Sequence, residues 1–386
     1  MIAQRCQSIQ PFYVMDLLAQ AQQLEQQGRD IIHMEVGEPD FTTPQPILDA
    51  GLAALRQGQV HYTAALGLPA LREAIAGHYQ QNYGVTVDPN RIVVTPGSSS
   101  GLQLLMHALI NPGDHVVLTD PGYPCNKNFV HLVGGQPVYC PLVPENGFHV
   151  SLEGLAAVWS NAVKAVMLAS PSNPTGAVMA LDELQAVVDW VHGRGGHVIV
   201  DEIYHGLHYD ARIATALATS DNVYVVNSFS KYYSMTGWRL GWLVVPSHEV
   251  MWFERLAQNL FLSAPTLAQH AALAAFLPET TTILEARKAQ FQQRRDFLVP
   301  ALRALGLSVA VAPQGAFYVY GKSTAWADDS FAWCTRVLQQ AGVAVTPGRD
   351  FAVHQAEQYV RFAYTTSIAR MAEAVDRLGH FISINR

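Results

Sequence analysis

Short apolar runs alternate with longer amphipathic stretches through the middle of the chain, from about residue 85 to residue 245. Runs of this length are typical of buried strands, and the stretches between them have the apolar spacing of surface helices. The predicted strands of this region are 91–95, 115–118, 136–139, 164–168, 197–200 and 223–226. Strands that alternate with helices predict an α/β fold, with a mainly parallel sheet covered by helices on both faces.

The pattern changes on either side of this region. An amphipathic helix is predicted at 13–28 and a short strand at 31–36. A polar helix at 282–304 leads out of the first domain, and a chain of 386 residues is too long for one simple core. Beyond that helix the sequence predicts short strands at 308–312, 316–319, 343–345 and 359–364, with helices at 330–341 and 368–381.

Composition narrows the functional classes. The 24 basic and 31 acidic residues give a net charge of −7, which argues against nucleic acid and anionic membranes as partners. Neither a signal sequence nor an apolar run long enough to cross a bilayer is evident, so we expect a cytoplasmic protein. The four cysteines have no CxxC spacing and are expected to be reduced, and no His, Cys, Asp or Glu group has the spacing of a metal site.

The strand at 223–226 leads into a segment with unusual chemistry. Lys231 follows this buried strand, and burial lowers the pKa of an ammonium group and favours the neutral amine. A positioned neutral amine attacks carbonyl groups, which is the first step of Schiff-base chemistry. Ser228, Ser230 and Arg239 are suited to hold a phosphate. The segment therefore suggests pyridoxal phosphate, whereas the alternative is a solvated loop lysine.

Polar and aromatic residues follow the other predicted strands of the sheet. A Gly-Ser turn with Ser98 and Ser99 precedes a helix, where it serves as a phosphate cradle or as a simple cap. Tyr123 is either a loop anchor or a surface on which a flat ring stacks. Asp201 ends an apolar strand, where it either pairs with a pyridinium nitrogen or caps a turn. Because ligands of open α/β sheets bind at the carboxyl ends of strands, these residues are expected to share one site.

Three further positions are ambiguous on their own. Asn173 either starts a turn or offers its amide to a phenolic oxygen, and its bond to the following proline is a candidate cis peptide. Gly37 either allows the backbone to approach a ligand closely or is a plain turn glycine. Arg361 lies in a strand of apolar and aromatic residues, where a guanidinium needs a carboxylate from the protein or from a substrate.

Five motifs, in this order, give the chain a specific resemblance. They are Asp-Pro-Gly-Tyr-Pro at 120–124, Asn-Pro-Thr-Gly at 173–176, Asp-Glu-Ile-Tyr at 201–204, Ser-Phe-Ser-Lys at 228–231 with Met-Thr-Gly-Trp-Arg-Leu-Gly at 235–241, and Val-Arg-Phe at 360–362. The chain resembles the class I and II aminotransferases, which are fold-type I enzymes dependent on pyridoxal phosphate. The resemblance covers essentially the whole chain and extends to the subgroup of bacterial aspartate and broad-specificity aminotransferases.

The resemblance implies a domain plan and an activity. A large cofactor-binding domain would span 46–285, and a smaller α+β domain would combine 286–386 with the N-terminal segment 1–45. The enzyme would move an amino group between an L-amino acid and a 2-oxo acid by a ping-pong mechanism, through a Schiff base on Lys231. Tyr62 would reach the phosphate of a second subunit, so a homodimer with shared sites is implied.

The resemblance also implies a role for each candidate residue. Lys231 would carry the proton, Asp201 would hold the pyridine nitrogen, and Tyr204 and Asn173 would bond the ring oxygen. Tyr123 would stack on the ring. The residues implied for the phosphate are Ser98, Ser99, Ser228, Ser230 and Arg239, with Tyr62 of the second subunit. Those implied for the substrate carboxylate are Arg361, Asn173 and the backbone of Gly37.

The sequence departs from this resemblance at two places. In the Gly-Ser turn, Ser100 and Gly101 replace the acidic residue or glutamine and the alanine that are more usual in the family. The helix after Gly101 contains no lysine or arginine that could bind a second substrate carboxylate. Arg5 is either a side-chain ligand or a solvated residue near the chain end. Two other functions are alternatives to an aminotransferase. A carbon–sulfur β-lyase would use the same residues. A non-catalytic ligand-sensing module would carry an added DNA-binding domain and a more basic charge.

Overall fold

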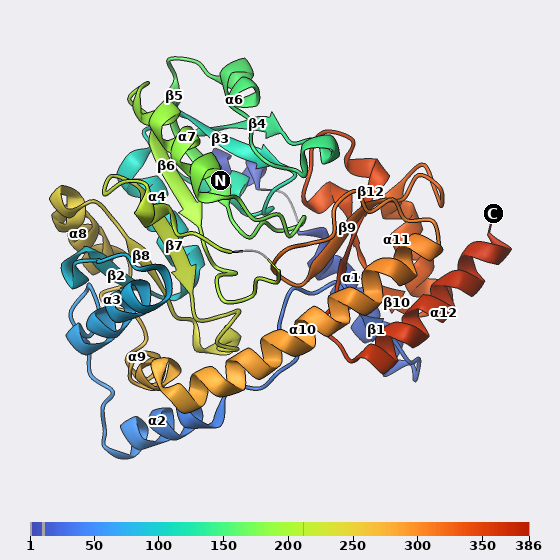
Figure 1. Ribbon diagram of the computed structural model, residues 1–386, viewed down its shortest axis with the longest axis horizontal. Helices are drawn as coiled ribbons and strands as arrows, with labels where there is room; N and C mark the ends of the chain where they lie inside the picture. Colours follow the sequence, from blue (N-terminus) through green and yellow to red (C-terminus); the bar gives the residue numbers. More distant parts are fainter. Residues whose placement is uncertain (1, 10–11, 211, 386) are drawn as a thin grey trace.

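A seven-stranded sheet forms the centre of the computed structural model, which describes residues 2–9, 12–210 and 212–385 (Figure 1). The strand order is β2-β8-β7-β6-β5-β3-β4, and all neighbours are parallel except the pairs that involve β8. The strands are β2 Ile92–Thr95, β3 His115–Asp120, β4 Gln136–Pro141, β5 Val163–Ala169, β6 His197–Asp201, β7 Tyr224–Ser228 and β8 Gly241–Val244. The mainly parallel sheet is confirmed, although β8, which runs antiparallel, was not predicted as a strand.

Helices cover both faces of this sheet, as predicted. Successive strand residues alternate between the faces: in β6, Ile199 packs into one apolar cluster, and Val198 and Val200 pack into the other. The face of Ile199 is covered by α4 Gly97–Leu109, α5 Asn126–Leu132 and α8 Val250–Leu260. The opposite face is covered mainly by α2 Gln45–Arg56, α3 Pro69–Tyr83, α6 Leu152–Val158, α7 Leu181–His192 and α9 Thr266–Leu273.

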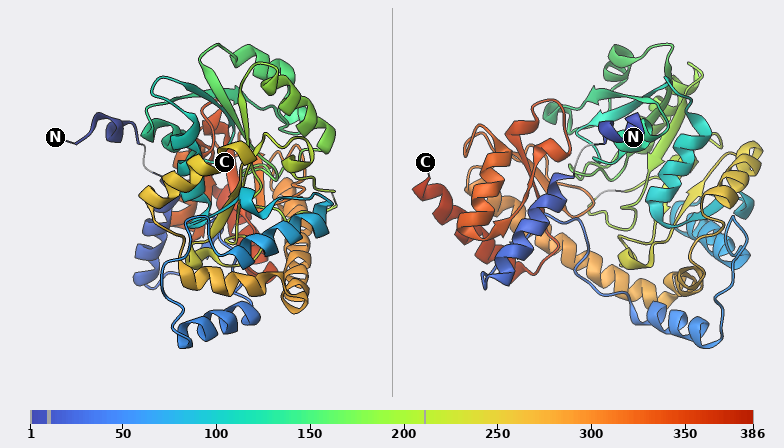
Figure 2. Two further views of the ribbon diagram at one scale, coloured as in Figure 1. Left: turned by 90° about the vertical axis from the view of Figure 1, so that its left-hand side faces the viewer. Right: turned by 180° about the vertical axis from the view of Figure 1, so that it is seen from behind.

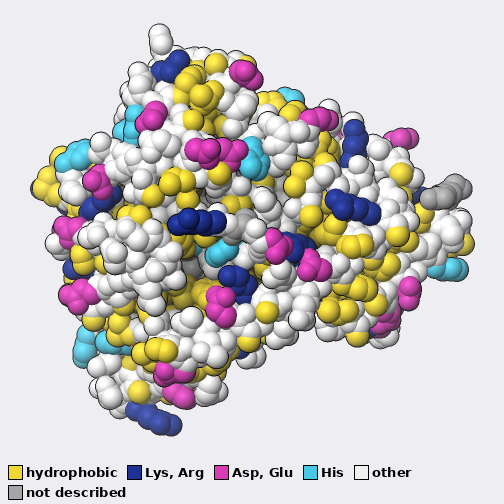
Figure 3. Space-filling model, in the orientation of Figure 1, with side chains coloured by type: hydrophobic (Ala, Val, Ile, Leu, Met, Phe, Trp, Pro, Cys, Tyr) yellow, Lys and Arg dark blue, Asp and Glu magenta, His cyan; other side chains and the backbone are white. Residues whose placement is uncertain are grey.

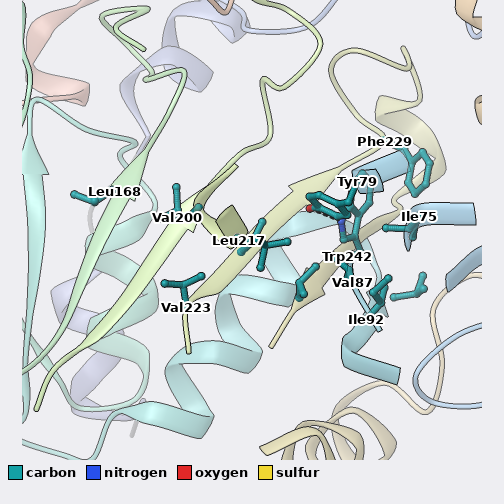
Figure 4. Packing of buried hydrophobic residues seen from close by; sticks show 14 of the residues in the cluster. Ile75, Tyr79, Val87, Ile92, Leu168, Val200, Leu217, Val223, Phe229 and Trp242 are labelled. Carbon is teal, nitrogen blue, oxygen red and sulfur yellow. Dashed lines mark hydrogen bonds between the residues drawn. The ribbon is translucent and has the colours of Figure 1, made fainter. Parts of the chain in front are cut away.

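The core on the second face is built around Trp242, the largest side chain buried there. Phe229 packs against it with ring centroids 4.9 Å apart, and the Trp242 indole donates a hydrogen bond of 3.1 Å to the Tyr79 hydroxyl (Figure 4). Trp242 lies in β8 and Phe229 lies two residues before Lys231. The segment that carries the candidate lysine is therefore anchored by aromatic packing, which fixes its position relative to the sheet.

A second group of elements packs beside the sheet. β11 Thr346–Pro347, β12 Tyr359–Ala363 and β9 Tyr318–Lys322 form an antiparallel sheet, and β1 Ile32–His33 pairs in parallel with β10 Val343–Ala344. The helices of this group are α11 Ser330–Ala341, α12 Ile368–Ile384 and α1 Tyr13–Gln26, and Figure 2 shows α1 against the C-terminal elements. The N-terminal segment thus packs with the end of the chain.

Helix α10, Pro278–Ala304, connects the two groups (Figure 1). Leu284 belongs to the core beside the large sheet, whereas Phe291 belongs to the core of the second group. The helix therefore passes from one core to the other between these residues. The predicted domain boundary at residue 285 falls in this interval, and the domain division as a whole stays a prediction.

Two predicted strands are wrong in extent. The stretch 308–312 forms only a single bridge, at Ser308, because the Val309 carbonyl accepts hydrogen bonds of 2.8 and 3.2 Å from the Arg303 guanidinium. The strand predicted at 31–36 ends at His33 because the Glu35 carbonyl beyond it accepts from side chains instead of a neighbouring strand. Both stretches are apolar enough for strands, but side-chain donors occupy their backbone acceptors.

The surface carries charges of both signs. Figure 3 shows Lys and Arg side chains interspersed with Asp and Glu on the face that it presents. Within the described residues, no helix has the length and apolarity that a bilayer crossing requires. The same part of the chain contains no group of three His, Cys, Asp or Glu side chains arranged to hold a metal ion.

Candidate active site

A cavity of about 320 Å³ lies at the carboxyl ends of the parallel strands, between the large sheet and the second group of elements. It gathers eleven of the thirteen predicted site residues: Gly37, Ser98, Ser99, Tyr123, Asn173, Asp201, Tyr204, Ser230, Lys231, Arg239 and Arg361. Ser228 and Tyr62 are not among its lining residues. Residues as distant in sequence as Ser98 and Lys231 thus converge at the strand ends, as an open α/β sheet requires.

Lys231 follows the end of β7 and lines this cavity, with its side chain half-buried. Its Nζ donates a hydrogen bond of 2.6 Å to the Gly37 carbonyl. Burial lowers the pKa of the Lys231 ammonium to about 8; the Glu38 carboxylate opposes this fall, while Arg361 contributes to it. With this pKa about one amine in ten is neutral at pH 7, far more than for an ordinary lysine, and the neutral amine is the form that attacks a carbonyl group.

Asp201 lies at the end of β6 and is 6% exposed. Its Oδ1 accepts a hydrogen bond of 3.0 Å from the Ile203 backbone N–H. Desolvation raises the pKa of this carboxyl to about 6, against the opposing effects of that hydrogen bond and of Lys231. A buried carboxylate that borders a cavity is costly unless a cation joins it there, so Asp201 is suited to a ligand with a protonated nitrogen.

The N-terminus of α4 forms an anion-binding corner of the cavity. Ser98 and Ser99 occupy the first turn of this helix, where backbone N–H groups lack intrahelical partners. The Arg239 guanidinium reaches the same turn because residue 97 is glycine: a Cβ there would lie 2.4 Å from Arg239 Nη2. Ser230 also lines this corner. Hydroxyls, a guanidinium and a helix N-terminus together suit a phosphate group.

Ser228 lies behind this corner rather than in it. Its side chain is buried, with Oγ 3.0 Å from Oγ of Ser230 and 3.1 Å from the Leu240 carbonyl oxygen. Its Oγ also accepts a 3.0 Å hydrogen bond from the Ser230 backbone N–H. In this arrangement Ser228 fixes Ser230, and its own hydroxyl is already fully occupied.

Tyr123, Tyr204 and Asn173 line the cavity around Asp201. The Tyr204 hydroxyl lies 2.8 Å from the hydroxyl of Tyr318, a residue that the sequence did not single out. The Asn173–Pro174 peptide bond is cis, as the sequence suggested. Ile203 also lines the cavity, so the site offers aromatic and aliphatic surface for a flat ring as well as polar groups.

Arg361 is held by aromatic rings and neutral acceptors. Its guanidinium carbon lies 4.2 Å from the ring centroid of Tyr318 and 4.4 Å from that of Phe351. Nη1 donates to the Asn173 side chain at 3.0 Å, and Nη2 donates to the Glu35 carbonyl. Among the described residues, no Asp or Glu side chain forms a salt bridge with this guanidinium, so its charge is available to a carboxylate from outside the chain.

Gly37 brings the backbone close to this arginine and to Lys231. A Cβ at residue 37 would lie 2.0 Å from the Tyr318 hydroxyl, so only glycine fits. The Tyr318, Phe351 and Glu35 contacts were missed because no sequence signal connects these distant segments. Tyr318 alone could have been suspected, as an aromatic residue in the predicted strand 316–319.

A sequence model of "Aminotransferase class I and II" matches residues 29–378. The chain belongs to this family of aminotransferases. It is 39% identical to a valine–pyruvate aminotransferase from Mycobacterium tuberculosis, with 97% of each chain covered. It is 36% identical to a (5-formylfuran-3-yl)methyl phosphate transaminase from Methanocaldococcus jannaschii, with 99% of this chain and 100% of that protein covered.

Solved structures of aminotransferases have the same fold. A crystal structure of an aminotransferase from Mycobacterium tuberculosis matches with a TM-score of 0.96 at 38% identity, covering 100% of this chain and 99% of that one. The aspartate aminotransferase from Thermus thermophilus, with maleate, matches with a TM-score of 0.93 at 33% identity, covering 98% and 99%. The predicted fold-type I architecture is confirmed, as is transamination over the carbon–sulfur lyase alternative.

This aminotransferase uses pyridoxal phosphate, and its cavity fits that cofactor. Asp201 offers an anion to a ring nitrogen, Lys231 offers an amine to an aldehyde, and the α4 corner offers donors to a phosphate. These three groups lie in one cavity, as a single ligand that carries all three functions requires. The substrates of the aminotransferase are an amino acid and a 2-oxo acid.

Proposed function

We propose that this cavity exchanges an amino group between an L-amino acid and a 2-oxo acid, with Lys231 as the catalytic residue. One observation carries the proposal: the partly neutral Lys231 amine shares a cavity with the buried Asp201 carboxylate and with the unpaired charge of Arg361. An amine, an anion for a ring nitrogen and a cation for a carboxylate are the three groups that this chemistry needs.

The roles of the cofactor-binding residues follow from what each side chain offers. Asp201 holds the ring nitrogen protonated, and Tyr204 and Asn173 bond the ring oxygen. Tyr123 and Ile203 enclose the ring. The phosphate is held by Ser98, Ser99, Ser230 and Arg239, and Ser228 supports this group through Ser230.

The substrate and the proton are handled by other residues. Pyridoxal phosphate, when bound, withdraws electrons from the substrate α-carbon. Arg361 binds the substrate α-carboxylate, with Asn173 and the Gly37 backbone beside it. The Lys231 amine accepts the α-proton at Nζ and then returns it in the next step. Its lowered pKa suits it to both transfers.

A half-reaction tests this proposal directly. The holoenzyme, mixed with an amino acid and no acceptor, is expected to lose the aldehyde absorbance of the cofactor and to release one equivalent of 2-oxo acid per site. Adding a second 2-oxo acid should restore the absorbance, which is the basis of ping-pong kinetics. Continuous pyruvate release from a cysteine-type substrate without an acceptor would instead indicate a lyase, and an unchanged spectrum with every amino acid would refute the proposal.

We also propose that the enzyme works as a homodimer whose sites are shared. Tyr62 is 80% exposed, which is unusual for a large aromatic side chain, and it lies outside the cavity. The 3-10 helix Gln4–Ser8 lies beside α5 at the edge of the molecule (Figure 2). An exposed tyrosine suits contact with a second copy of the chain, in which Tyr62 would reach the partner's phosphate.

Complementation between two inactive variants tests the shared site. In a hybrid dimer of Tyr62→Ala and Lys231→Ala chains, one of the two sites would combine a native Lys231 with a native Tyr62. Mixed and refolded chains are expected to recover about a quarter of wild-type activity, because half of the dimers are hybrids with one intact site. If the mixture is no more active than the separate variants, Tyr62 serves its own subunit or none.

A further inference from the structure

Within the described residues, the lining of the cavity combines an apolar wall with no lysine or arginine other than Lys231, Arg239 and Arg361. We infer that both substrates of this aminotransferase carry a single carboxylate and an uncharged, mainly apolar side chain. This inference rests on the proposed function, because it takes Arg361 as the ligand of the α-carboxylate. The cavity-lining residues that bind neither the cofactor nor the α-carboxylate are left to contact the substrate side chain, and they indicate its class.

The positive charges that line the cavity are all assigned. Within the described residues they are Lys231, Arg239 and Arg361. Lys231 is the catalytic amine, Arg239 lies at the N-terminus of α4, and Arg361 takes the α-carboxylate. Within its own subunit, a second substrate carboxylate would therefore be desolvated without a cationic partner, which is strongly unfavourable.

Helix α4 supplies no replacement for the missing cation. Its first turns face the cavity through Ser98, Ser99 and Leu102, and from Gly101 to its end it carries no Lys or Arg. The acidic residues in the lining, Glu38 and Asp201, make the potential at the site more negative. Charge within this chain thus disfavours aspartate, glutamate and 2-oxoglutarate.

The apolar wall comes from the N-terminal segment. Phe12, Val14, Met15 and Val36 line the cavity; Val14 is 5% exposed, whereas Met15 is 52% exposed at the mouth. An aliphatic substrate side chain packed on this wall would remove apolar surface from water on both partners. The flexible thioether of Met15 suits side chains of different shapes.

The wall is fixed relative to Arg361 by one carboxylate. Asp350 accepts hydrogen bonds from the backbone N–H groups of Tyr13 (3.0 Å) and Val14 (2.8 Å), which hold the first turn of α1. Its neighbour Phe351 stacks on the Arg361 guanidinium. The carboxylate ligand and the side-chain wall are thus held by adjacent residues, so the side chain of a bound substrate has a defined place to pack.

A panel of amino acids in the half-reaction tests the inference. The rate of conversion of the aldehyde form at limiting substrate is expected to be about 100-fold higher for valine, leucine and methionine than for aspartate, glutamate and lysine. Equal or faster conversion by glutamate, aspartate or lysine would overturn the inference while leaving transamination intact. If no amino acid converts the cofactor, the proposed function fails instead.

Equilibrium binding gives a readout that is independent of turnover. Calorimetry of the holoenzyme with 4-methylpentanoate and with glutarate compares one carboxylate with two in acids that lack a reactive amine. We expect 4-methylpentanoate to bind at least about tenfold more tightly. Equal or tighter binding of glutarate would show that a cation reaches the site, including one from a second subunit, and would overturn the inference.

Substitution at Met15 tests which residues set the preference. Met15→Arg places a cation in the apolar wall and is expected to raise the glutamate-to-leucine ratio of conversion rates at least about tenfold. Met15→Gln, of similar length but uncharged, is the matched control and should slow leucine without accelerating glutamate. The same gain in both variants, or no change in either, would show that Met15 does not face the substrate side chain.

Discussion

Replacing Lys231 by alanine is expected to abolish turnover, with a loss of more than about 10⁴-fold in kcat. The variant loses both the amine that bonds the cofactor aldehyde and the group that moves the proton. The cavity should survive, because the segment is anchored by Phe229 and Trp242 rather than by the lysine. Pyridoxal phosphate is therefore expected to bind non-covalently, with the absorbance of the free aldehyde.

Lys288→Ala is the matched control for this prediction. Lys288 lies on α10 outside this cavity, and its only ion pair, among the described residues, is with Glu285 at 3.4 Å. This variant should keep wild-type absorbance and turnover within about twofold, since surface ion pairs contribute little. If Lys231→Ala instead retains full activity, or if the two variants behave alike, the assignment of the catalytic lysine is wrong.

The environment of Lys231 also predicts a pH dependence. Burial lowers the pKa of the amine to about 8, so the fraction that can bond an aldehyde rises with pH and levels off above that value. Reconstitution of the apoenzyme with pyridoxal phosphate, followed by absorbance, is expected to show this plateau. A rate that continues to climb toward the ordinary lysine pKa of about 10.4 would contradict a desolvated amine.

The sequence predicted the parallel sheet and the strand-end residues because both depend on local pattern. An apolar run such as 197–200 specifies a buried strand, and Asp201 follows it whatever the rest of the chain does. The candidate residues that follow the sheet's strands, such as Tyr123, Asn173 and Lys231, meet in one cavity for the same reason, since parallel strands align their carboxyl ends. Ser228 is the exception within its motif: hydrogen bonds to Ser230 and Leu240 direct its hydroxyl away from the cavity.

The surroundings of Arg361 could not be predicted in this way. Its partners come from positions 35, 173, 318, 346 and 351, and no local pattern relates these positions. The apolar wall is similar, because a helix pattern shows that Val14 and Met15 are apolar but not that they meet a cavity. Long-range packing decides both features, and substrate choice depends on them.

Asp201→Asn is expected to lower turnover by about 10³-fold and, at the same time, to stabilise the apoprotein. The activity is lost because the amide cannot keep a ring nitrogen protonated. Geometry should be preserved, since the asparagine oxygen can still accept the hydrogen bond from the Ile203 N–H. Steady-state kinetics and urea unfolding of the apo and holo forms measure the two effects.

The sign of the stability change follows from the pKa. Burial raises the pKa of Asp201 from 3.8 to about 6, so the folded state binds this proton more tightly than the unfolded state. The contribution of the protonated carboxyl to folding stability is thus lost as the pH rises from 3.8 to about 6. Above this range the carboxylate lowers the free energy of unfolding of the apoprotein by about 3 kcal/mol. Asparagine removes that cost, so at pH 8 the apo variant should unfold at higher urea concentration than the wild type.

Glu202→Gln separates the role of Asp201 from burial of charge in general. Glu202 is also fully buried, and burial raises its pKa to about 8, but it faces Thr215 and Ala216 rather than the cavity. Its replacement should leave turnover within about threefold. A comparable loss of turnover in both variants would contradict a specific role for Asp201. If Asp201→Asn does not stabilise the apoprotein, the Asp201 carboxylate does not destabilise the fold. The expected pattern has a physical reason: Asp201 is unfavourable in the empty cavity and becomes favourable only when a protonated ring nitrogen pairs with it.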